Sequence, residues 1–328
     1  MDRNFNLVTG GAGFIGTNLC EYLMRHGTNV LVIDDLCSGS ERNVRHLEDV
    51  ARETGVEFIF IQEGLEYYTG ESFGSSYYIP YDVQLDCIYH LACPASPNVY
   101  MKYPLYTLNT CINGTSNVID LALDQQCPML LTSTSEVYGD PDVHPQPENY
   151  VGRVNFRGTR SCYDEGKRVA ETLMYLMKSN MFKTVRIFNT FGPHMDPNDG
   201  RFISNFINQI LDDKPLTIYG DGSQTRSICF VDDIVRGLVA MMNSSSTGPI
   251  NLGNPVELTV LEWGELISDI CGVPLRTEFM LPMEDDPKRR CPDITKAKNV
   301  LGWEPKYDIR KGLEVTIAYY KRLRDERK

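Results

Sequence analysis

The sequence lacks an apolar run of membrane-spanning length, a Cys-x-x-Cys pair and an excess of positive charge. A bilayer span needs about 20 consecutive apolar residues, and the N-terminus carries no signal-peptide pattern. We therefore expect a cytoplasmic protein with no membrane contact. Its 44 acidic residues outnumber 32 lysines and arginines, for a formal net charge of -12, which argues against nucleic acid as a partner.

Ten cysteines are scattered along the chain, many of them in apolar stretches. Without paired spacing they fit reduced thiols better than a disulfide framework. His90 and Cys93 have a spacing that some metal sites use, but no second pair accompanies them. We therefore predict a buried structural role for the histidine, and no metal site.

The N-terminal stretch has the order strand, glycine-rich turn, helix, strand, acid. Asn6–Thr9 is a short apolar strand, Gly10–Gly16 contains Gly-x-Gly-x-x-Gly, Asn18–His26 is helical, and the strand Val30–Ile33 ends at Asp34. Such glycines let the backbone approach a pyrophosphate at a helix N-terminus. An acid at the second strand end accepts from the ribose hydroxyls and repels a 2'-phosphate, which predicts NAD rather than NADP. The predicted cofactor-binding residues here are Gly10, Gly13, Phe14, Ile15, Gly16 and Asp34.

Further apolar strands alternate with helical patterns, which predicts an α/β fold with a doubly wound, parallel Rossmann-type sheet. The strands are expected at 58–62, 87–91, 129–132 and 184–188, and the helices at 106–124 and 163–179. Residues 63–82 interrupt this rhythm with a stretch rich in Tyr, Gly and Ser. A structureless connection of that length is usually functional or mobile.

The pattern changes after residue 190 to a smaller α/β region. It contains a predicted helix at 202–211, a strand at 216–219, a strand at 229–231, a helix capped by Asp232 or Asp233, and a last helix near 310–324. We predict two domains. Residues 1–190 with about 228–254 bind the dinucleotide, and residues 191–227 with 255–328 form a smaller substrate-binding domain.

Tyr163 and Lys167 lie four residues apart in a predicted helix, so their side chains share one face. A tyrosine with a pKa near 10 is a poor base at neutral pH, and lowering that pKa to about 7 needs roughly 4 kcal/mol. One ammonium about 4 Å away supplies about that much at an effective dielectric near 20. Tyr163 is therefore a candidate base for an alcohol proton, provided that an oxidised cofactor lies beside it.

Taken together, these motifs resemble those of the extended short-chain dehydrogenase/reductases, over nearly the whole chain except 63–82. Within that family the chain is most similar to the branch that decarboxylates UDP-glucuronate to UDP-xylose. The stretches that carry the resemblance are 90–97, 132–141 with 144–146, 162–168 with 170–172, 187–193, 198–201, 222–226 and 290–294.

The resemblance implies a tightly held NAD, which Leu91, Tyr163 and Lys167 also contact, and a reaction in three steps. Tyr163 takes the C4 hydroxyl proton while hydride leaves C4, and Thr134 holds that oxygen. The resulting C4 ketone lies beta to the carboxylate, so carbon dioxide leaves and its electrons delocalise into an enolate. Protonation at C5 and return of the hydride then complete the reaction without net redox change.

Glu136 and Arg290 are the residues expected to decide which chemistry follows oxidation. In similar sugar dehydratases an Asp–Glu pair follows the Thr, whereas here Ser135 precedes Glu136, which argues against loss of water. Glu136 could disfavour solvation of the carboxylate or position a proton-carrying water, and Arg290 could bind the carboxylate or donate near C5. The alternative is an ion pair between Glu136 and Arg290 that only orders the cleft.

The substrate-binding candidates follow the family motifs. Arg201 and Arg226 are expected to clamp the pyrophosphate, with surface ion pairs as the alternative. Tyr219 contacts the uridine or packs in the core, and Asn189 binds the diphosphate or forms a strand-end turn. Pro94, Ser96 and Tyr100 shape the sugar pocket, or the prolines simply end the strand.

Several positions depart from the family pattern. Asn109 and Cys111 stand where Lys and Asn are usual in Lys-Thr-Asn, Val151 replaces Trp, and His194 replaces Arg. They bear on cofactor affinity and the substrate pocket rather than on the reaction class.

Three other functions remain open. A decarboxylase could stop at the 4-keto pentose and release NADH, a UDP-glucuronate 4-epimerase would retain the carboxylate, and a non-catalytic dinucleotide sensor would keep only the fold. The resemblance also implies a homodimer that pairs through helices 106–124 and 163–179, whose apolar stripes would also suit core burial.

Overall fold

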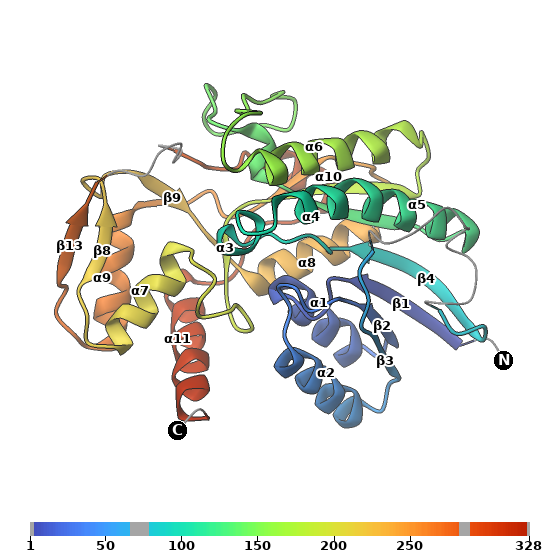
Figure 1. Cartoon of the computed structure of the whole chain (residues 1–328), viewed down its shortest axis with the longest axis horizontal. Coiled ribbons are helices and arrows are strands. Elements are labelled where there is room, and N and C mark those ends of the chain that lie inside the picture. Colours follow the sequence, from blue (N-terminus) through green and yellow to red (C-terminus); the bar gives the residue numbers. More distant parts are fainter. Residues whose placement is uncertain (1–2, 66–78, 282–288, 327–328) are drawn as a thin grey trace.

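The computed structural model describes residues 3–65, 79–281 and 289–326. Its centre is a parallel sheet of seven strands in the order β11-β6-β5-β4-β1-β2-β3 (Figure 1). The strands are β1 (Arg3–Thr9), β2 (Val30–Ile33), β3 (Phe58–Ile61), β4 (Val83–His90), β5 (Met129–Thr134), β6 (Phe182–Ile187) and β11 (Ile250–Leu252). The strand order reverses between β1 and β4, and ligands bind at such a switch point, outside the carboxyl ends of the strands. The predicted doubly wound fold is confirmed.

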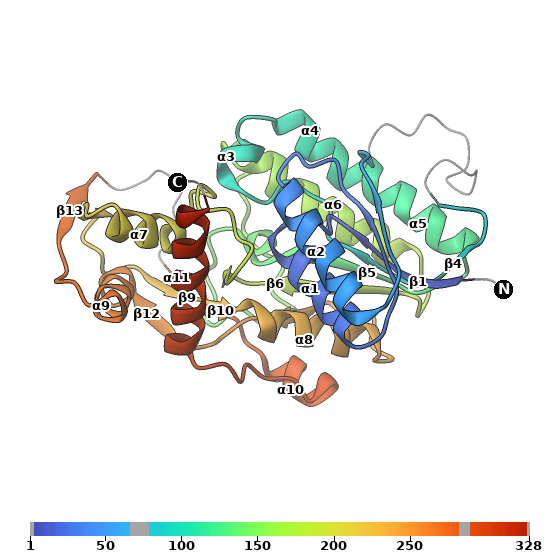
Figure 2. The same cartoon turned by 90° about the horizontal axis from the view of Figure 1, so that it is seen from below.

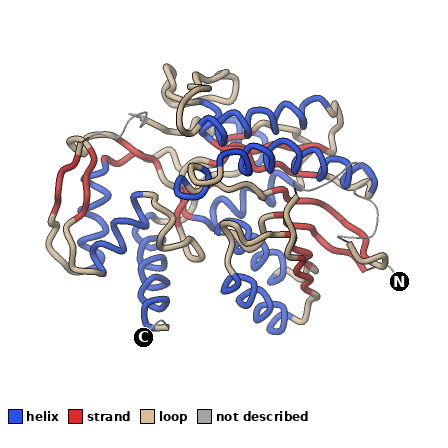
Figure 3. Tube along the Cα trace, in the orientation of Figure 1, coloured by secondary structure: helices blue, strands red, loops and turns tan. Residues whose placement is uncertain are grey.

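Helices cover both faces of this sheet (Figures 1, 2 and 3). One layer contains α1 (Phe14–Arg25), α2 (Glu41–Thr54) and α8 (Val231–Met242), and the other contains α4 (Pro104–Asn109), η1 (Thr110–Gly114), α5 (Thr115–Asp124) and α6 (Ser161–Leu176). Successive side chains of a strand point to opposite faces. Phe5 and Leu7 of β1 accordingly pack in the core that includes Val118 and Ala170 of α5 and α6, while Val8 packs in the other core.

A smaller group of elements lies beside one end of the sheet (Figure 2). It contains α7 (Phe202–Leu211), β8 (Leu216–Tyr219), β9 (Thr225–Ser227), β12 (Glu257–Thr259), α9 (Val260–Cys271), β13 (Thr277–Met280) and α11 (Ile309–Asp325). Strands β8 and β13 pair in parallel, and β9 and β12 pair antiparallel. Strands β7 (Thr190–Phe191) and β10 (Cys229–Phe230) pair where the chain passes between the two groups. The predicted two-domain division remains a prediction.

Some sequence-based boundaries were wrong. Helix α8 has Phe230 as its N-cap, and Asp232 and Asp233 lie in its first turn. Asp233 instead accepts from the backbone N–H groups of Lys306, at 2.9 Å, and Tyr307, at 3.0 Å, so its carboxylate holds a distant loop. The predicted helix 106–124 begins at residue 104 and changes to a π-helical turn in η1.

Helices α2, α9 and α10 (Thr295–Leu301) were not predicted, and α10 lies against α8 and β11. Most of the unusual stretch 63–82 lies outside the described residues, which include only 63–65 and 79–82 of it. Within the described residues, no helix combines the length and the apolar character that a bilayer crossing requires.

Candidate active site

The glycine-rich turn after β1 forms a cradle that side chains would fill. Gly10 has φ +73°, and a Cβ there would lie 2.7 Å from Ala92 N. A Cβ at Gly16 would lie 2.1 Å from the Gly10 carbonyl oxygen. Helix α1 begins at Phe14 with Gly13 as N-cap, and no side chain satisfies its first N–H groups. These groups fit the pyrophosphate of a dinucleotide.

Asp34 lies at the carboxyl end of β2 and lines the cavity beside this turn. Its carboxylate accepts from Ala12 N at 3.0 Å and from Leu36 N at 2.8 Å. Burial raises the pKa of Asp34 to about 6, although the two backbone hydrogen bonds oppose the shift. The acid is therefore held next to the turn, where a ribose would bind.

One cavity of about 830 Å³ connects the glycine turn to helix α6. The predicted site residues that line it are Gly10, Gly13, Phe14, Ile15, Gly16, Asp34, Leu91, Pro94, Ser96, Tyr100, Thr134, Glu136, Tyr163, Lys167, Asn189 and Arg201. Tyr219, Arg226 and Arg290 are not among its lining residues. Most of the predicted site residues therefore lie around one cavity, and their roles remain predictions.

Tyr163 and Lys167 come from α6 and face the end of β5. Lys167 Nζ donates to the Thr132 carbonyl at 2.9 Å, and Tyr163 hydrogen-bonds with Thr134. The Tyr100 ring lies parallel to the Tyr163 ring, with centroids 5.2 Å apart. These contacts fix the phenol in one orientation above the strand end.

The pKa of Tyr163 is raised well above its ordinary value, mainly by burial and then by the neighbouring Cys93. The hydrogen bond with Thr134 opposes this shift only in part. From the sequence we expected Lys167 to lower the pKa of Tyr163. In the structure burial outweighs that effect, because desolvating a phenolate costs more free energy than the surrounding charges provide. Further positive charge beside the ring is needed to make this phenol a base.

Glu136 follows β5 in the short helix η2 (Ser135–Tyr138) and forms ion pairs with Arg290 and Arg160. The Glu136 side chain is 13% exposed and that of Arg290 6%. Burial alone would raise the pKa of Glu136, but the two guanidinium groups outweigh it and hold the pKa at about 2. Arg290 also donates to the Gly139 carbonyl at 2.8 Å. The ion pair weighed from the sequence therefore exists, with a second arginine added.

Sequence reasoning missed Arg160 and Asp164, which flank Tyr163. Arg160 lines the cavity, and nothing in the motifs singles it out. Asp164 is buried, and its Oδ1 has no hydrogen-bond partner among the described residues. Burial and then the charge of Glu136 raise the pKa of Asp164 to about 7. A buried carboxyl group with a raised pKa therefore lies next to Tyr163 in α6, although Asp164 is not among the residues that line the cavity.

Hydrogen bonds join two loops that line the cavity. Arg201 Nη2 donates to the Ala95 carbonyl at 2.7 Å, and Ser96 Oγ donates to the Asp199 carbonyl at 2.8 Å. Arg201 also pairs with the Asp199 carboxylate at 3.0 Å. The segment after β4 is thus tied to the segment before α7, and Arg201 is held at the cavity.

Arg226 and Tyr219 belong to the smaller group of elements. Arg226 is buried on β9, where its Nη1 donates to the Thr225 carbonyl at 2.9 Å. Tyr219 ends β8 and is 38% exposed, so its ring is not packed in the core. The binding roles given to both residues remain predictions.

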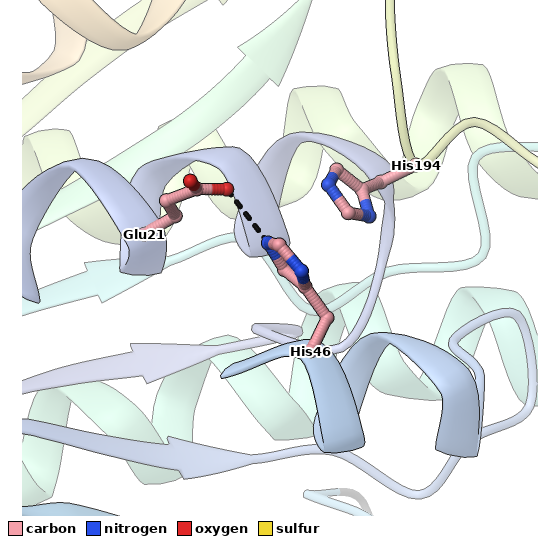
Figure 4. Close-up of side chains that lie close together, drawn as sticks. All are labelled: Glu21, His46 and His194. Carbon is pink, nitrogen blue, oxygen red and sulfur yellow. Dashed lines mark hydrogen bonds and ion pairs between the residues drawn. The ribbon is translucent and has the colours of Figure 1, made fainter. Parts of the chain in front are cut away.

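Three ligand-type side chains gather beside the cavity (Figure 4): Glu21 on α1, His46 on α2, and His194. Their ligand atoms lie within 4.8 Å of one another, and His46 Nε2 is 2.7 Å from Glu21 Oε2. Arg25 donates to the other Glu21 oxygen at 2.8 Å. Burial, then the charges of His46 and Arg42, lowers the pKa of His194 to about 3. The surrounding positive charge disfavours a bound cation, and we interpret the group as packing between α1, α2 and this loop.

His90 has the structural role expected from the sequence. Its Nδ1 lies 2.8 Å from Thr9 Oγ1 and its Nε2 lies 3.1 Å from Thr115 Oγ1. Burial, followed by the charge of Lys167, lowers its pKa to about 3. The ring therefore joins β1, β4 and α5 as a neutral group.

Comparisons with known proteins agree with this geometry. A family model described as the NAD dependent epimerase/dehydratase family matches residues 6–253. UDP-glucuronic acid decarboxylase 1 of Danio rerio is 47% identical over 324 residues, covering 98% of this chain and 73% of that protein. UDP-glucuronic acid decarboxylase 4 of Arabidopsis thaliana is 46% identical over 318 residues, covering 96% of this chain and 68% of that protein.

Solved structures share the whole fold. UDP-glucose 4-epimerase of Thermotoga maritima, with UDP-glucose, has a TM-score of 0.85 at 27% identity and covers 98% of this chain and 99% of its own. A mutant of the UDP-glucuronic acid 4-epimerase of Bacillus cereus, in complex with UDP-4-deoxy-4-fluoro-glucuronic acid and NAD, has a TM-score of 0.82 at 28% identity. It covers 97% of this chain and 99% of its own.

Proposed function

The chain belongs to the NAD dependent epimerase/dehydratase family, and from this premise we propose that it uses NAD to decarboxylate UDP-glucuronate to UDP-xylose. The observation that carries the proposal is its 47% identity, over nearly the full chain, to a protein named UDP-glucuronic acid decarboxylase. The site agrees, because Thr134, Glu136, Tyr163 and Lys167 line one cavity with the glycine cradle. A sensor that keeps only the fold has no need of this set.

Tyr163 is the group that takes the proton from the C4 hydroxyl, with Thr134 holding the same oxygen. The chemistry that bound NAD supplies is hydride transfer from and back to C4, together with a positive charge that favours ionisation of a buried phenol. Gly10, Gly13 and Gly16 let the backbone approach the dinucleotide, and Asp34 is placed for its ribose. Lys167, fixed on the Thr132 carbonyl, keeps a positive charge on the same helix face as Tyr163.

Loss of carbon dioxide follows from the position of the ketone. A C4 ketone is beta to the C6 carboxylate, so the electrons of the breaking bond pass into an enolate. The hydroxyl groups of Tyr163 and Thr134 stabilise that oxygen as an oxyanion hole does. Proton delivery at C5 and restoration of the C4 hydroxyl then give the pentose.

Glu136 acts as a fixed negative charge in this scheme. With a pKa of about 2, it stays ionised at neutral pH and cannot donate a proton there. Its charge disfavours the nearby substrate carboxylate and favours departure as neutral carbon dioxide. Arg290 is not a lining residue, so we propose that it positions Glu136 rather than binding substrate. Arg160 and Arg201 are two of the cations that line the cavity, with Arg42, Lys102 and Lys167, and we propose that these two bind the anionic sugar nucleotide.

Incubation with UDP-glucuronate and mass analysis of the nucleotide sugar tests this function. We expect UDP-xylose and one equivalent of carbon dioxide without accumulation of NADH. Stoichiometric NADH with limiting NAD would identify an enzyme that stops at the 4-keto pentose. A product that retains its carboxylate would identify an epimerase.

We also propose that the protein forms a homodimer through α4, α5 and α6. Large apolar side chains are exposed on these helices, including Leu105 at 75%, Leu123 at 49% and Tyr175 at 79%. Such residues are typical of surfaces that a partner covers. Light scattering that gives a monomer mass at micromolar concentration would contradict this. The cytoplasmic location remains a prediction.

A further inference from the structure

Two cysteines from different elements meet beside the catalytic helix. Cys93 follows β4 and lines the cavity, whereas Cys111 lies in η1 and is 2% exposed. Their Sγ atoms are 3.1 Å apart. All ten cysteines are free thiols, and within the described residues this is the one pair joined by a thiol–thiol hydrogen bond.

We propose that Cys93 and Cys111 form a redox switch: hydrogen peroxide oxidises the pair to a disulfide, which reversibly inactivates the enzyme. A disulfide bond is about 2.05 Å long, so each sulfur needs to move only a fraction of an ångström from its present position.

The surroundings make Cys93 the attacking sulfur. Burial opposes its ionisation, but the hydrogen bond from Cys111 and the charge of Lys167 outweigh burial and lower the pKa of Cys93. That hydrogen bond, followed by burial, raises the pKa of Cys111 well above its ordinary value. The hydrogen bond from Cys111 and the charge of Lys167 therefore favour the thiolate on the sulfur that faces the cavity. Reactive cysteines lie in such electropositive, accessible positions.

The reaction balances in two steps. The Cys93 thiolate attacks one peroxide oxygen, the O–O bond breaks, and the hydroxide that leaves takes up a proton to become water. This gives a sulfenic acid on Cys93. The Cys111 sulfur then attacks the Cys93 sulfur, the S–O bond breaks, and the leaving hydroxide takes the Cys111 proton. Two thiols lose two electrons, and one peroxide becomes two waters.

The disulfide would disturb both walls of the site. Cys93 is followed by Pro94 and by Ala95, whose carbonyl accepts from Arg201, so moving Cys93 displaces the cavity wall. Cys111 packs against α6 at Gly166, where an added Cβ would lie 3.0 Å from Cys111 Cβ. Gly166 immediately precedes Lys167. Because a displacement of about 1 Å can cost about 100-fold in rate, we expect a shift of about half that size to reduce turnover by at least about tenfold.

The test is peroxide treatment of the NAD-loaded protein, followed by peptide mass analysis and turnover of UDP-glucuronate. We expect the Cys93 and Cys111 peptides to be linked with loss of two hydrogens, turnover to fall at least about tenfold, and dithiothreitol to restore both. Cys111→Ser should give no linked peptides and leave Cys93 as a sulfenic acid that a dimedone probe traps, and Cys111→Asn serves if serine impairs folding. Cys271→Ser, whose thiol lies in α9, is the matched control and should respond as the parent does.

Each outcome of the peroxide experiment either supports or overturns the proposed switch. Oxidation at other cysteines while Cys93 and Cys111 remain thiols would overturn the proposal, as would a linked pair with unchanged turnover. The turnover readout rests on the proposed function, but the mass readout does not. If the reduced protein fails to convert UDP-glucuronate, NAD titration replaces turnover. Unchanged NAD affinity in the linked protein would then refute the switch.

Discussion

Removing Arg290 should destabilise the protein by leaving Glu136 buried with one fewer cation. The pKa of Glu136 lies at about 2 instead of 4.5, and each unit corresponds to about 1.4 kcal/mol. The arginines therefore contribute about 3 kcal/mol beyond the cost of burial, which agrees with about 3–5 kcal/mol for breaking a buried ion pair. We expect Arg290→Ala to lower the free energy of unfolding at pH 7 by about 3 kcal/mol.

The pH dependence of this loss follows from the sign of the shift. Because the folded pKa is depressed, the contribution is fully present above about pH 4.5 and is lost as pH falls towards 2. At pH 3.5 the parent has lost roughly 1 kcal/mol of this contribution, so the difference in free energy of unfolding between parent and variant should narrow. Urea unfolding at pH 7 and pH 3.5 measures both values.

Arg289→Ala is the matched control for Arg290→Ala. Arg289 is the adjacent residue, its side chain is 60% exposed, and it lies 3.6 Å from Glu257. An exposed pair of this kind contributes under about 1 kcal/mol. The prediction is contradicted if Arg290→Ala lowers the free energy of unfolding at pH 7 no more than Arg289→Ala does. It is also contradicted if the loss caused by Arg290→Ala is the same at both pH values.

Three further predictions concern the cavity. Tyr163→Phe should lower turnover by about 10³-fold, as loss of a general base does. NAD titration of the variant should show unchanged binding. Turnover at the parent rate would exclude Tyr163 as the base. Gly16→Ala should weaken NAD binding at least about tenfold. The added Cβ would lie 2.1 Å from the Gly10 carbonyl oxygen, and overpacking of this kind costs about 1–3 kcal/mol. Equal NAD affinity of parent and variant in the same titration would contradict this prediction. Asp164→Asn should raise the melting temperature at pH 8 but not near pH 4. The pKa of Asp164 is raised from 3.8 to about 7 in the folded protein, so ionised Asp164 lowers the free energy of unfolding only at the higher pH. A gain in melting temperature that does not depend on pH would contradict this prediction.

The parts of the site that local sequence predicts are those in which spacing alone sets the geometry. Gly10–Gly16 is one continuous stretch that ends in the first turn of α1, and Tyr163 and Lys167 are one helical turn apart, so no distant residue is needed to infer their arrangement. The strand patterns likewise predicted six of the seven strands of the central sheet, because buried parallel strands are short and apolar, but they missed β11.

The missed features depend on contacts between distant segments. Arg160 pairs with Glu136 across 24 residues of sequence, a separation that follows no helix or strand period. Asp233 was predicted as a helix cap because acids favour that position, but its carboxylate accepts hydrogen bonds from the backbone N–H groups at 306–307. The burial of Tyr163, which reverses the expected pKa shift, is also set by tertiary packing.

The most direct test of the central claim uses UDP-glucuronate that carries deuterium at C4. A hydride that leaves C4 and returns within one cavity predicts UDP-xylose with the deuterium retained at C4, one equivalent of carbon dioxide and no free NADH. Intact UDP-glucuronate, or UDP-xylose that has lost the label to the medium, would contradict the account.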